Sequence, residues 1–553
     1  MLSKIVKIFS PSDWRFVGIV SGLLILITGV PYLVAIWLAP PGTVFSGTHG
    51  LTTGDFFVYF SYITEGKLGM WPLINVFSGG NDTAFPFSLF WHGVAALARI
   101  LPWSAPFIFQ LLRLLFIFPA VVFLYWLMGK FFTEQPLRRA ALIFLLSASG
   151  LGVYAMPFIL PFFHSNFYFI PMDVWVPEQS MFLTLYHSPH VIFSSVVLML
   201  LLYALYAAFE FRSWRWSALG TLASAILFLF HPFHIPTITA VMGVYVLARI
   251  LQKHSCWRQL HFLLPAVLVT GAVIWYEWRF LQLHPDLAVM FSQNILPTTV
   301  WWVTLVSYGW IFPLAVFGAV RVVRRVGGFF RLQPIWLLAV VWFLAQSAVL
   351  YAPVLWQRRL TEGLQFPMAV LAVVGLQVLW RRYVAGWWQK EKTYMYPYAV
   401  VFFVFVLFFG MSPVGAIVRD IQLFSRQVDD RYFVPKDFLE AFDWMRQQVS
   451  PQSVVLAEPY ESQFIAGYTA WLVFAGHDVQ TKDWDNKILL VEDFFRSGMT
   501  PAQEISFLNR THIRYIFFDT EKQADFVQRL LRDHVGLHIV YQNNRAVILE
   551  YRP

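Results

Sequence analysis

Residues 54–71 read GDFFVYFSYITEGKLGMW, and they place a carboxylate, Asp55, at the head of an otherwise apolar segment. Apolar side chains recur at Phe56, Phe60 and Ile63, which is the spacing of one face of a helix. The segment follows shortly after the first long apolar run of the chain. It therefore predicts an amphipathic helix beside a membrane span, with a charged residue at its start.

The composition is that of a protein with many membrane spans. Of 553 residues, 58% are hydrophobic and only 13% are charged, and the mean hydropathy is +0.59. No soluble domain of this size has such values. Aromatic residues make up 19%, including 24 Trp, which suits many anchors at a membrane interface. Cys256 is the only cysteine, so disulfides within the chain and cysteine-based metal sites are excluded.

Eleven apolar runs predict membrane-spanning helices, since a bilayer core takes about 20 helical residues. These runs are 16–38, 106–129, 140–162, 187–209, 217–233, 234–251, 261–283, 299–320, 334–353, 365–380 and 396–412. A further apolar stretch, 85–101, is predicted to lie along the outer surface. Counting it as a span would move the basic loop from Lys130 to Arg139 to the outside.

Basic residues set the orientation. With the N-terminus in the cytoplasm, 18 Lys and Arg fall in inside segments and 6 fall outside, as the positive-inside rule requires. The odd number of spans then puts the C-terminal region outside. No small-residue cleavage site follows the first run, so we expect an uncleaved anchor. In a bacterium this predicts a multi-pass protein of the inner membrane with a periplasmic or extracellular C-terminal domain.

The charge balance divides the chain. Residues 1–412 carry a balance of +13 and residues 413–553 one of −4. The high pI therefore reflects membrane orientation, and no nucleic-acid partner is expected. We predict a transmembrane domain over 1–412, with a long outer loop at about 39–105, and a soluble domain over 413–553. Helical and strand patterns alternate in this tail, which indicates an α/β fold with a partly parallel sheet.

Taken together, the long outer first loop, its early acid, the amphipathic helices and the outer C-terminal domain resemble the GT-C superfamily of membrane glycosyltransferases. The most specific local piece is 54–71, where Asp55 and Tyr59, four residues on, look like the first-loop pattern of the family. The stretch FAGHDVQTKDWDNK (474–487) is similar to tails of bacterial members. The resemblance implies an α-helical polytopic fold and a polyprenyl-phosphate sugar donor used at the outer face.

Asp55 is the candidate catalytic base. Sugar transfer passes through an oxocarbenium-like state while the acceptor hydroxyl loses a proton, and a carboxylate within hydrogen-bond reach can take that proton. The resemblance assigns this part to Asp55. The alternative is that Asp55 only caps a helix beginning at Phe56, a position that Asp favours.

A second carboxylate is harder to place. The family often has adjacent acids here, or a separated pair that holds a divalent metal, but Asp55 is followed by Phe56. Asp82, Asp173 and Glu178 are the alternatives, and we favour Glu178, in the second outer loop at about 163–186. The alternative for Glu178 is a solvated loop acid. We expect no cofactor, and a divalent metal stays open.

Arg358 and Arg359 depart from the positive-inside rule, because they lie on the outer side just before a span. Guanidinium groups pair bidentately with phosphate, and in the resembled enzymes a basic residue of a late outer loop meets the donor phosphate. The alternatives are interfacial snorkelling or a salt bridge from Arg358 to Glu362. Lys67 and Arg99 are further candidates for the donor.

Two histidine pairs lie at the mouths of spans. His187 and His190 occur in LYHSPHVIF, and His231 and His234 in FLFHPFHIP. A spacing of three can seat a metal on a helix, although a proline interrupts the second pair. We expect His187 and His190 to form hydrogen bonds either in the core or, together with Tyr59, in an acceptor pocket.

The leading hypothesis is a glycosyltransferase that takes a sugar from a lipid-linked donor and passes it to a glycan, lipid or protein acceptor. The alternative is a non-enzymatic lipid or polymer transporter, or an accessory subunit with a GT-C-like body. Transporters usually have two related halves and charges near the bilayer midplane, and neither is evident in this sequence. A membrane sensor would need a cytoplasmic output element, and the inside loops are short.

Overall fold

A computed structural model describes residues 9–79, 84–163, 166–252, 257–385, 404–496 and 498–552. The chain forms two compact units. Unit 1 comprises Met1–Val30, Leu112–Trp275 and Ile295–Val418, and unit 2 comprises Pro31–Leu111, Tyr276–Asn294 and Arg419–Pro553. Asp82, Cys256 and the first part of the run 396–412 lie outside the described residues.

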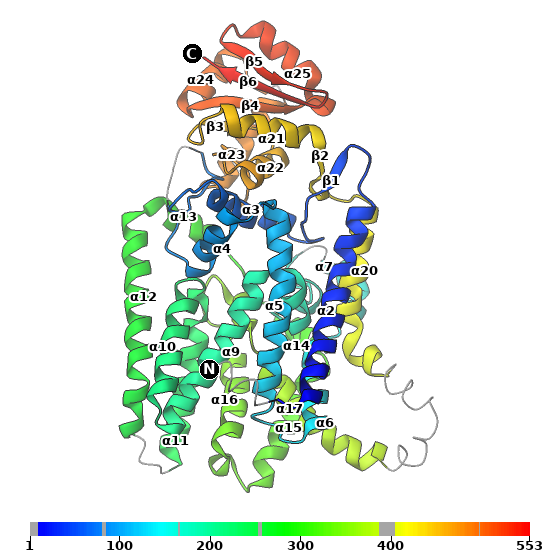
Figure 1. Ribbon diagram of the computed structural model, residues 1–553, viewed down its shortest axis with the longest axis vertical. Helices are drawn as coiled ribbons and strands as arrows, with labels where there is room; N and C mark the ends of the chain where they lie inside the picture. The colour runs from blue at the N-terminus through cyan, green and yellow to red at the C-terminus, as the bar shows by residue number, and fades with distance from the viewer. Residues whose placement is uncertain are drawn as a thin grey trace. The chain divides into compact units, whose positions relative to one another are not determined.

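Unit 1 is built from long apolar helices (Figure 1). Its helices, some of which continue into unit 2, are α2 (Pro11–Trp37), α5 (Ala105–Met128), α6 (Gln135–Ser147), α7 (Gly152–Phe163), α8 (Met181–His187), α9 (Pro189–Phe211), α10 (Trp214–Phe228), α11 (Ile235–Leu251), α12 (Leu264–Leu283), α14 (Trp301–Tyr308), α15 (Ile311–Arg325), α16 (Pro334–Val349), α17 (Gln365–Leu379) and α20 (Met411–Ser425). Short turns join them, including η1 (Met172–Val174), η2 (Pro232–His234) and η5 (Gln357–Thr361).

The protein is a multi-pass membrane protein. Among the described residues, seven helical segments are long and apolar enough to cross a membrane, and α14 with α15, bent by 82°, makes an eighth if the pair is one span. The described part of each predicted run is mostly helical, but loop residues 148–151 interrupt the run 140–162, and a turn at 309–310 interrupts the run 299–320. Helices α10 and α16 have 15 and 16 residues, about 22–24 Å at the helical rise, which is short of a 30 Å hydrocarbon core. The count of eleven therefore stays a prediction.

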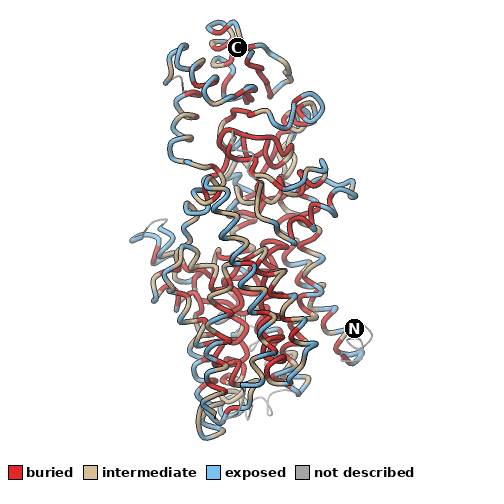
Figure 2. Tube along the Cα trace, turned by 90° about the vertical axis from the view of Figure 1, so that its left-hand side faces the viewer, coloured by how far each residue is buried: buried red, intermediate tan, exposed pale blue. Residues whose placement is uncertain are grey.

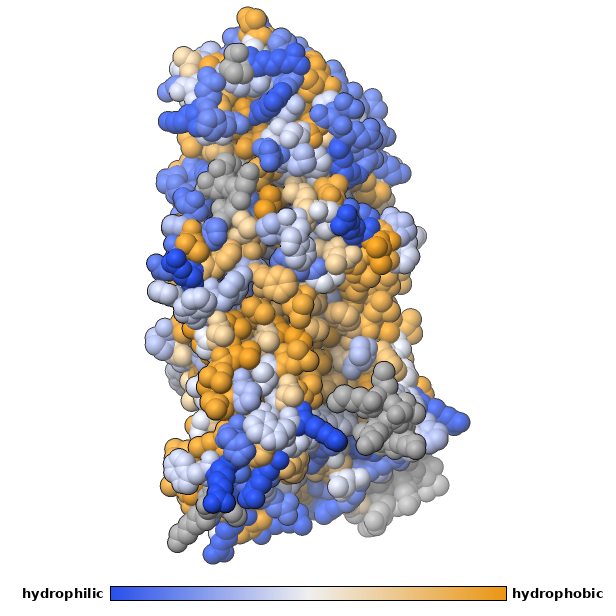
Figure 3. All heavy atoms as spheres, turned by 60° about the vertical axis from the view of Figure 1, so that its left-hand side comes forward, coloured by the Kyte–Doolittle hydropathy of each residue, from blue (hydrophilic) through white to orange (hydrophobic). Residues whose placement is uncertain are grey.

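Helix α9 lies at the centre of unit 1. In α9, 83% of the most apolar window is buried, against 33% in α2, so α9 is surrounded by protein while α2 presents Leu23 and Leu26 outward. Figure 2 shows buried residues concentrated along the inner helices. On the face in Figure 3, apolar residues gather over the middle of the long helices and hydrophilic ones at their lower ends. This pattern fits a bundle bathed in lipid.

Small residues let α15 and α17 approach closely. A Cβ atom added to Gly318 would lie 1.9 Å from the carbonyl oxygen of Leu371, and one added to Gly375 would lie 2.8 Å from that of Leu314. Such contacts are typical of helix pairs in membranes, because lipid provides little hydrophobic drive and close packing must hold the helices. Helix α17 also packs on α6 and α16, and α11 packs on α16.

Unit 2 combines the first loop with the C-terminal region. Its helices are α3 (Thr53–Lys67), α4 (Leu89–Ile100), α13 (Pro285–Gln293), α21 (Lys436–Gln448), α22 (Pro459–Thr469), α23 (Trp484–Phe495), α24 (Pro501–Arg510) and α25 (Thr520–Asp533). Its strands are β1 (Thr43–Phe45), β2 (Phe433–Pro435), β3 (Val454–Leu456), β4 (Ile513–Asp519), β5 (Leu537–Gln542) and β6 (Ala546–Tyr551).

The C-terminal sheet has the order β3-β4-β6-β5. Strands β3 and β4 are parallel, whereas β6 pairs antiparallel with both β4 and β5. The predicted α/β character and partly parallel sheet are confirmed. Helices α21, α24 and α25 pack on the sheet (Figure 1), and strand β6 is buried along its whole length.

The first loop folds together with the tail. Strand β1 pairs antiparallel with β2, and the backbone N–H of Val473 donates to the carbonyl of Val76 at 2.9 Å. Helix α3 packs on α4 and α22, and Gly66 allows this contact because an added Cβ would lie 2.4 Å from Ala95. The two compact units are defined by contacts within the chain and do not separate a membrane domain from a soluble one. The predicted boundary at residue 412 therefore stays a prediction.

Candidate functional site

Asp55 lies in the first turn of α3, and the helix begins earlier than the sequence indicated. Thr52 precedes it in the left-handed region (φ 53°), and Asp55 is the third helical residue. The alternative of Asp55 as the N-cap of a helix starting at Phe56 is therefore wrong. Its side chain is 43% exposed, and Oδ1 lies 3.2 Å from Nε2 of His477. The carboxylate is thus both accessible and held by a partner.

The contacts of His477 fix where its proton lies. The backbone N–H groups of Val479 and Gln480 both donate to Nδ1, at 3.2 and 3.3 Å. The exposed Asp478 lies beside this nitrogen and itself accepts the N–H of Val479. Two backbone N–H groups directed at Nδ1 favour the tautomer that carries the imidazole proton on Nε2. His477 therefore donates to the carboxylate of Asp55.

The turn that carries His477 is tightly held. Oγ1 of Thr481 accepts the backbone N–H groups of Gly476 and His477 and donates to the carbonyl of Phe77 at 2.7 Å. Nε2 of Gln463 donates to the carbonyl of Gly476 at 2.7 Å. The histidine itself is 5% exposed. These bonds position the ring against α3 without any contribution from Asp55.

Sequence reasoning missed His477 as a site residue. It occurs in the stretch 474–487, whose similarity to tails of bacterial members assigns no role to this histidine. The sequence shows that this stretch contains a histidine, but no local pattern links His477 to Asp55, which lies more than 400 positions earlier.

Tyr59 and Lys67 lie further along α3. The Tyr59 ring stacks between Trp91 and Phe109, at centroid distances of 5.2 and 5.7 Å, so it forms part of an aromatic cluster one turn from Asp55. Lys67 is the last residue of the helix, about 18 Å from Asp55 along the axis. Its Nζ donates to the carbonyls of Leu101 and Trp103 at 3.1 and 2.6 Å.

Glu65 is a buried acid of the same helix. Its Oε2 accepts the backbone N–H of Ile74 at 2.8 Å. Burial raises the pKa of this carboxyl to about 8, although the bonds from Ile74 and Ser61 act in the opposite direction. Desolvation disfavours the charged form, so Glu65 is protonated at neutral pH and serves the packing of the loop.

The remaining predicted residues belong to unit 1. Nη1 of Arg359 pairs with Oε1 of Glu178 at 3.2 Å, and the Glu178 side chain is buried. Glu178 is therefore not a solvated loop acid. The guanidinium carbon of Arg359 lies 5.0 Å from the ring centre of Phe233, and that of Arg358 lies 4.3 Å from Trp175. Both guanidinium groups are thus stacked on aromatic faces, and Arg359 also pairs with Glu178.

Glu362 bonds to residues other than those predicted for it. Oγ of Ser194 and Oγ of Ser195 donate to its Oε1 at 2.5 and 2.8 Å. Its Oε2 lies 2.9 Å from Nε2 of His234. The carboxylate thus accepts hydrogen bonds from α9 and lies close to the His234 ring of η2.

The four histidines are buried. His187 ends α8 and His190 lies in the first turn of α9, and the ring centres of His190 and His231 are 6.0 Å apart. His231, His234 and Glu362 offer ligand atoms that all lie within 4.8 Å of one another. Within the described part of the chain, these three residues form the group that can hold a metal ion.

Asp173 is an interior residue of the second loop. Its Oδ2 accepts from the N–H of Gly152 at 2.9 Å and from Oγ of Ser412 at 2.5 Å. Burial raises its pKa to about 7, while these two bonds lower it. The side chain fastens η1 to the start of α7 and to α20.

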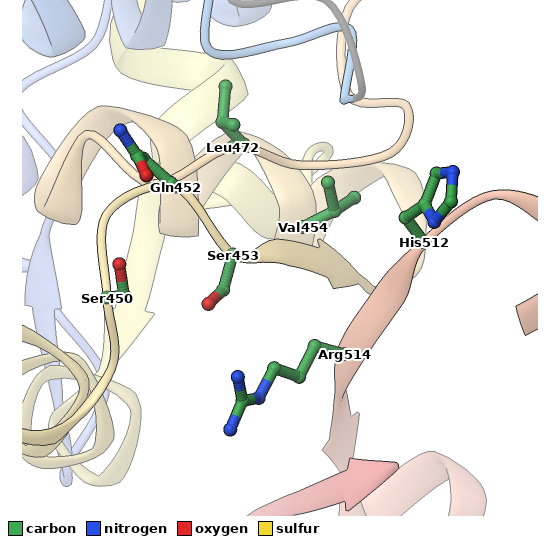
Figure 4. A pocket seen from close by; sticks show the side chains of 7 residues that line it. All are labelled: Ser450, Gln452, Ser453, Val454, Leu472, His512 and Arg514. Carbon is green, nitrogen blue, oxygen red and sulfur yellow. The ribbon is translucent and has the colours of Figure 1, made fainter. Parts of the chain in front are cut away.

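A separate hollow of about 420 Å³ lies at the edge of the C-terminal sheet (Figure 4). It is lined by Ser450, Gln452, Ser453, Val454, Leu472, His512 and Arg514. Nη2 of Arg514 pairs with Oε1 of Glu550 at 3.0 Å. None of the sequence-predicted site residues lines this hollow.

Comparison with solved structures finds similar folds among membrane proteins. The oligosaccharyltransferase of Archaeoglobus fulgidus, in its apo form, matches with a TM-score of 0.50 and 11% identity, over 90% of this chain and 70% of that chain. ArnT from Cupriavidus metallidurans, bound to undecaprenyl phosphate, matches with a TM-score of 0.51 and 13% identity, over 96% and 98% of the two chains. No family profile matches the sequence, and no curated protein matches it.

Proposed function

The chain has the fold of the GT-C membrane glycosyltransferases, and on that premise we propose that it transfers a sugar from a polyprenyl-phosphate donor to an acceptor at the outer face of the membrane. The observation that carries the proposal is the pairing of Asp55 with His477 on the first-loop helix. The similar ArnT structure holds undecaprenyl phosphate, which supports the same class of lipid donor for this chain.

Asp55 is the proposed general base. Its carboxylate takes the proton of the acceptor hydroxyl as the oxygen attacks the anomeric carbon and the bond to the lipid phosphate breaks. A single displacement of this kind inverts the anomeric configuration. The exposed part of Asp55 leaves access for the hydroxyl, and His477 holds the carboxylate in place through the 3.2 Å contact with its Oδ1.

The proposed part of Arg358 is to neutralise the phosphate leaving group. The guanidinium of Arg358 stacks on Trp175, and guanidinium groups bind phosphate oxygens in bidentate geometry. Arg359 shares this part, with Glu178 as the carboxylate that orients it through the 3.2 Å pair. Lys67 is a weaker candidate for the donor, since carbonyl oxygens hold its Nζ.

The acceptor is proposed to be a glycan, lipid or protein of the cell envelope. Tyr59 supplies an aromatic surface near Asp55, and aromatic rings commonly line ligand sites. His187 and His190 are proposed as pocket residues. The proton transfer assigned to Asp55 uses no metal ion.

We propose an N-terminus in the cytoplasm and an outer C-terminal region, in the inner membrane of a bacterium. The support is the distribution of basic residues, such as Arg321, Arg324 and Arg325 at the end of α15, which the positive-inside rule puts in the cytoplasm. Asp55 then lies in an outer loop, where a donor presented at the outer face can reach it.

A transfer assay tests the proposal. The full-length protein in lipid nanodiscs is given polyprenyl-phosphate hexoses and pentoses together with lipid, glycan and peptide acceptors. Mass spectrometry then measures the release of polyprenyl phosphate and the mass gained by the acceptor. We expect coupled release and gain for one donor class. Stable binding of lipid donors without release from any of them would contradict the proposal.

A further inference from the structure

A buried cluster in unit 1 contains two imidazoles and a carboxylate. His231 precedes η2, His234 is its last residue, and Glu362 follows η5. The exposed fractions are 6%, 0% and 1%. These residues come from two connections that are far apart in sequence, and the proton transfer assigned to Asp55 does not use them.

The geometry of the cluster is not that of an ordinary hydrogen-bonded pair. Nε2 of His234 lies 2.9 Å from Oε2 of Glu362, yet within the described structure no hydrogen bond of acceptable angle joins them. Nδ1 of His231 and Nδ1 of His234 are likewise buried without a hydrogen-bond partner among the described residues. Buried polar atoms are normally satisfied, so these orphan nitrogens require a further partner.

Glu362 is positioned in advance for such a partner. Oε1 is held by the hydroxyls of Ser194 and Ser195, and Nε2 of Gln346 donates to the carbonyl of Glu362 at 2.7 Å. With Oε1 engaged, Oε2 is the oxygen that faces the histidines. Outer-shell hydrogen bonds that orient a ligating carboxylate are a regular feature of metal sites.

We propose that His231, His234 and Glu362 bind a divalent transition-metal cation of the Zn²⁺ class. Two imidazoles and one carboxylate are a known zinc ligand set, whereas Mg²⁺ and Ca²⁺ prefer oxygen ligands. Ligand atoms around tetrahedral zinc lie about 3.3 Å apart, so the present spread within 4.8 Å closes with small side-chain rotations. The positive ion also compensates the buried charge of Glu362.

The proposed cation has a structural consequence. It ties the connection at 231–234 to η5, which carries Arg358 and Arg359. Arg359 is already packed on Phe233, between the two histidines. The metal therefore fixes the backbone that presents both guanidinium groups. This inference stands on the cluster itself and does not depend on the proposed transfer.

Metal content is the direct test. The full-length protein is purified in detergent, stripped with a chelator, titrated with ZnCl₂ and measured by mass spectrometry and calorimetry. We expect one Zn²⁺ per chain, which a 100-fold excess of MgCl₂ does not displace. Glu362→Gln and His234→Gln should each weaken zinc binding at least about 100-fold, the upper end of the loss caused by removing an outer-shell partner. The matched controls Glu134→Gln and His261→Gln, at exposed positions, should bind zinc as the parent does.

A spectroscopic test uses the parent protein alone, so its result does not depend on whether a variant folds. Co²⁺ added to the stripped parent protein should give the visible absorption of a four-coordinate nitrogen–oxygen site, and Zn²⁺ should abolish it. Absence of both zinc binding and this absorption overturns the proposal. Zinc binding that Glu362→Gln and His234→Gln leave unchanged also overturns it, because the ion then lies elsewhere.

Discussion

Nε2 of His477 lies 3.2 Å from Oδ1 of Asp55, although the two residues are separated by 422 positions in the chain. The first loop and the C-terminal region meet at this bond, within one compact unit. The C-terminal region therefore contributes to the proposed site, since its His477 donates a hydrogen bond to the carboxylate proposed as the base. Removal of the C-terminal region should therefore remove the hydrogen bond from His477 to Asp55.

Replacing His477 tests whether it positions Asp55. His477→Phe keeps a ring but removes the Nε2–H, and we expect kcat to fall about 10–150-fold while KM for the sugar donor changes little, since a hydrogen bond to a charged group contributes about 1.5–3 kcal/mol. His477→Gln, whose amide can donate from a similar place, should recover part of kcat. His538→Phe, at an exposed position of β5, is the control. An unchanged kcat in His477→Phe would remove the residue from the mechanism.

Arg358→Gln tests the phosphate assignment. Loss of a charge-assisted bond of about 1.5–3 kcal/mol should weaken donor binding about 10–150-fold and leave acceptor binding unchanged. Arg359→Gln would also remove the ion-pair partner of the buried Glu178, so its effect on donor binding would be mixed with an effect on stability. Calorimetry with a polyprenyl-phosphate donor measures the effect. Arg381→Gln, an exposed residue beyond the other end of α17, is the control, and equal donor affinity in Arg358→Gln and Arg381→Gln would disprove the assignment.

Glu65→Gln tests the effect of burial on an acid of α3. Burial raises the pKa of Glu65 to about 8, so its contribution to stability is complete below about pH 4.5 and is lost as pH rises through 8. The amide cannot ionise, and Glu65→Gln should therefore raise Tm more at pH 8.5 than at pH 5. Each kcal/mol gained is about 2–4 °C for a unit of this size. The same Tm difference at both pH values, as expected for the exposed control Glu440→Gln, would contradict the burial argument.

Reporter fusions test the orientation. A fusion after Gly328, in the turn between α15 and α16, should report a cytoplasmic position, because Arg321, Arg324, Arg325 and Arg331 surround it. A fusion at Asp525 should report the outside. Alkaline phosphatase is active only outside, and green fluorescent protein folds only inside. The opposite pair of signals would reverse the topology and put Asp55 on the cytoplasmic face.

The fold was predictable because it rests on local patterns. The apolar runs and the alternation of helix and strand in the tail each follow from side chains within about 20 positions. The number of spans was less accessible, because the lengths of α10 and α16 depend on where turns such as η2 begin. Most of the individual site residues were predictable from the sequence, but the contacts between them were not. Arg359 with Glu178, Glu362 with His234, and His477 with Asp55 are contacts across 128–422 positions, which only the packed fold brings together.

Asp55→Asn in the donor-release assay is the most direct measurement of the central claim. The amide keeps the size of the side chain and can still accept from His477, but it cannot take a proton. We expect sugar transfer to fall by about 100-fold or more with Tm and donor binding unchanged, whereas Asp443→Asn, an exposed position on α21, retains full activity. Transfer by Asp55→Asn at the rate of the parent protein would contradict the account.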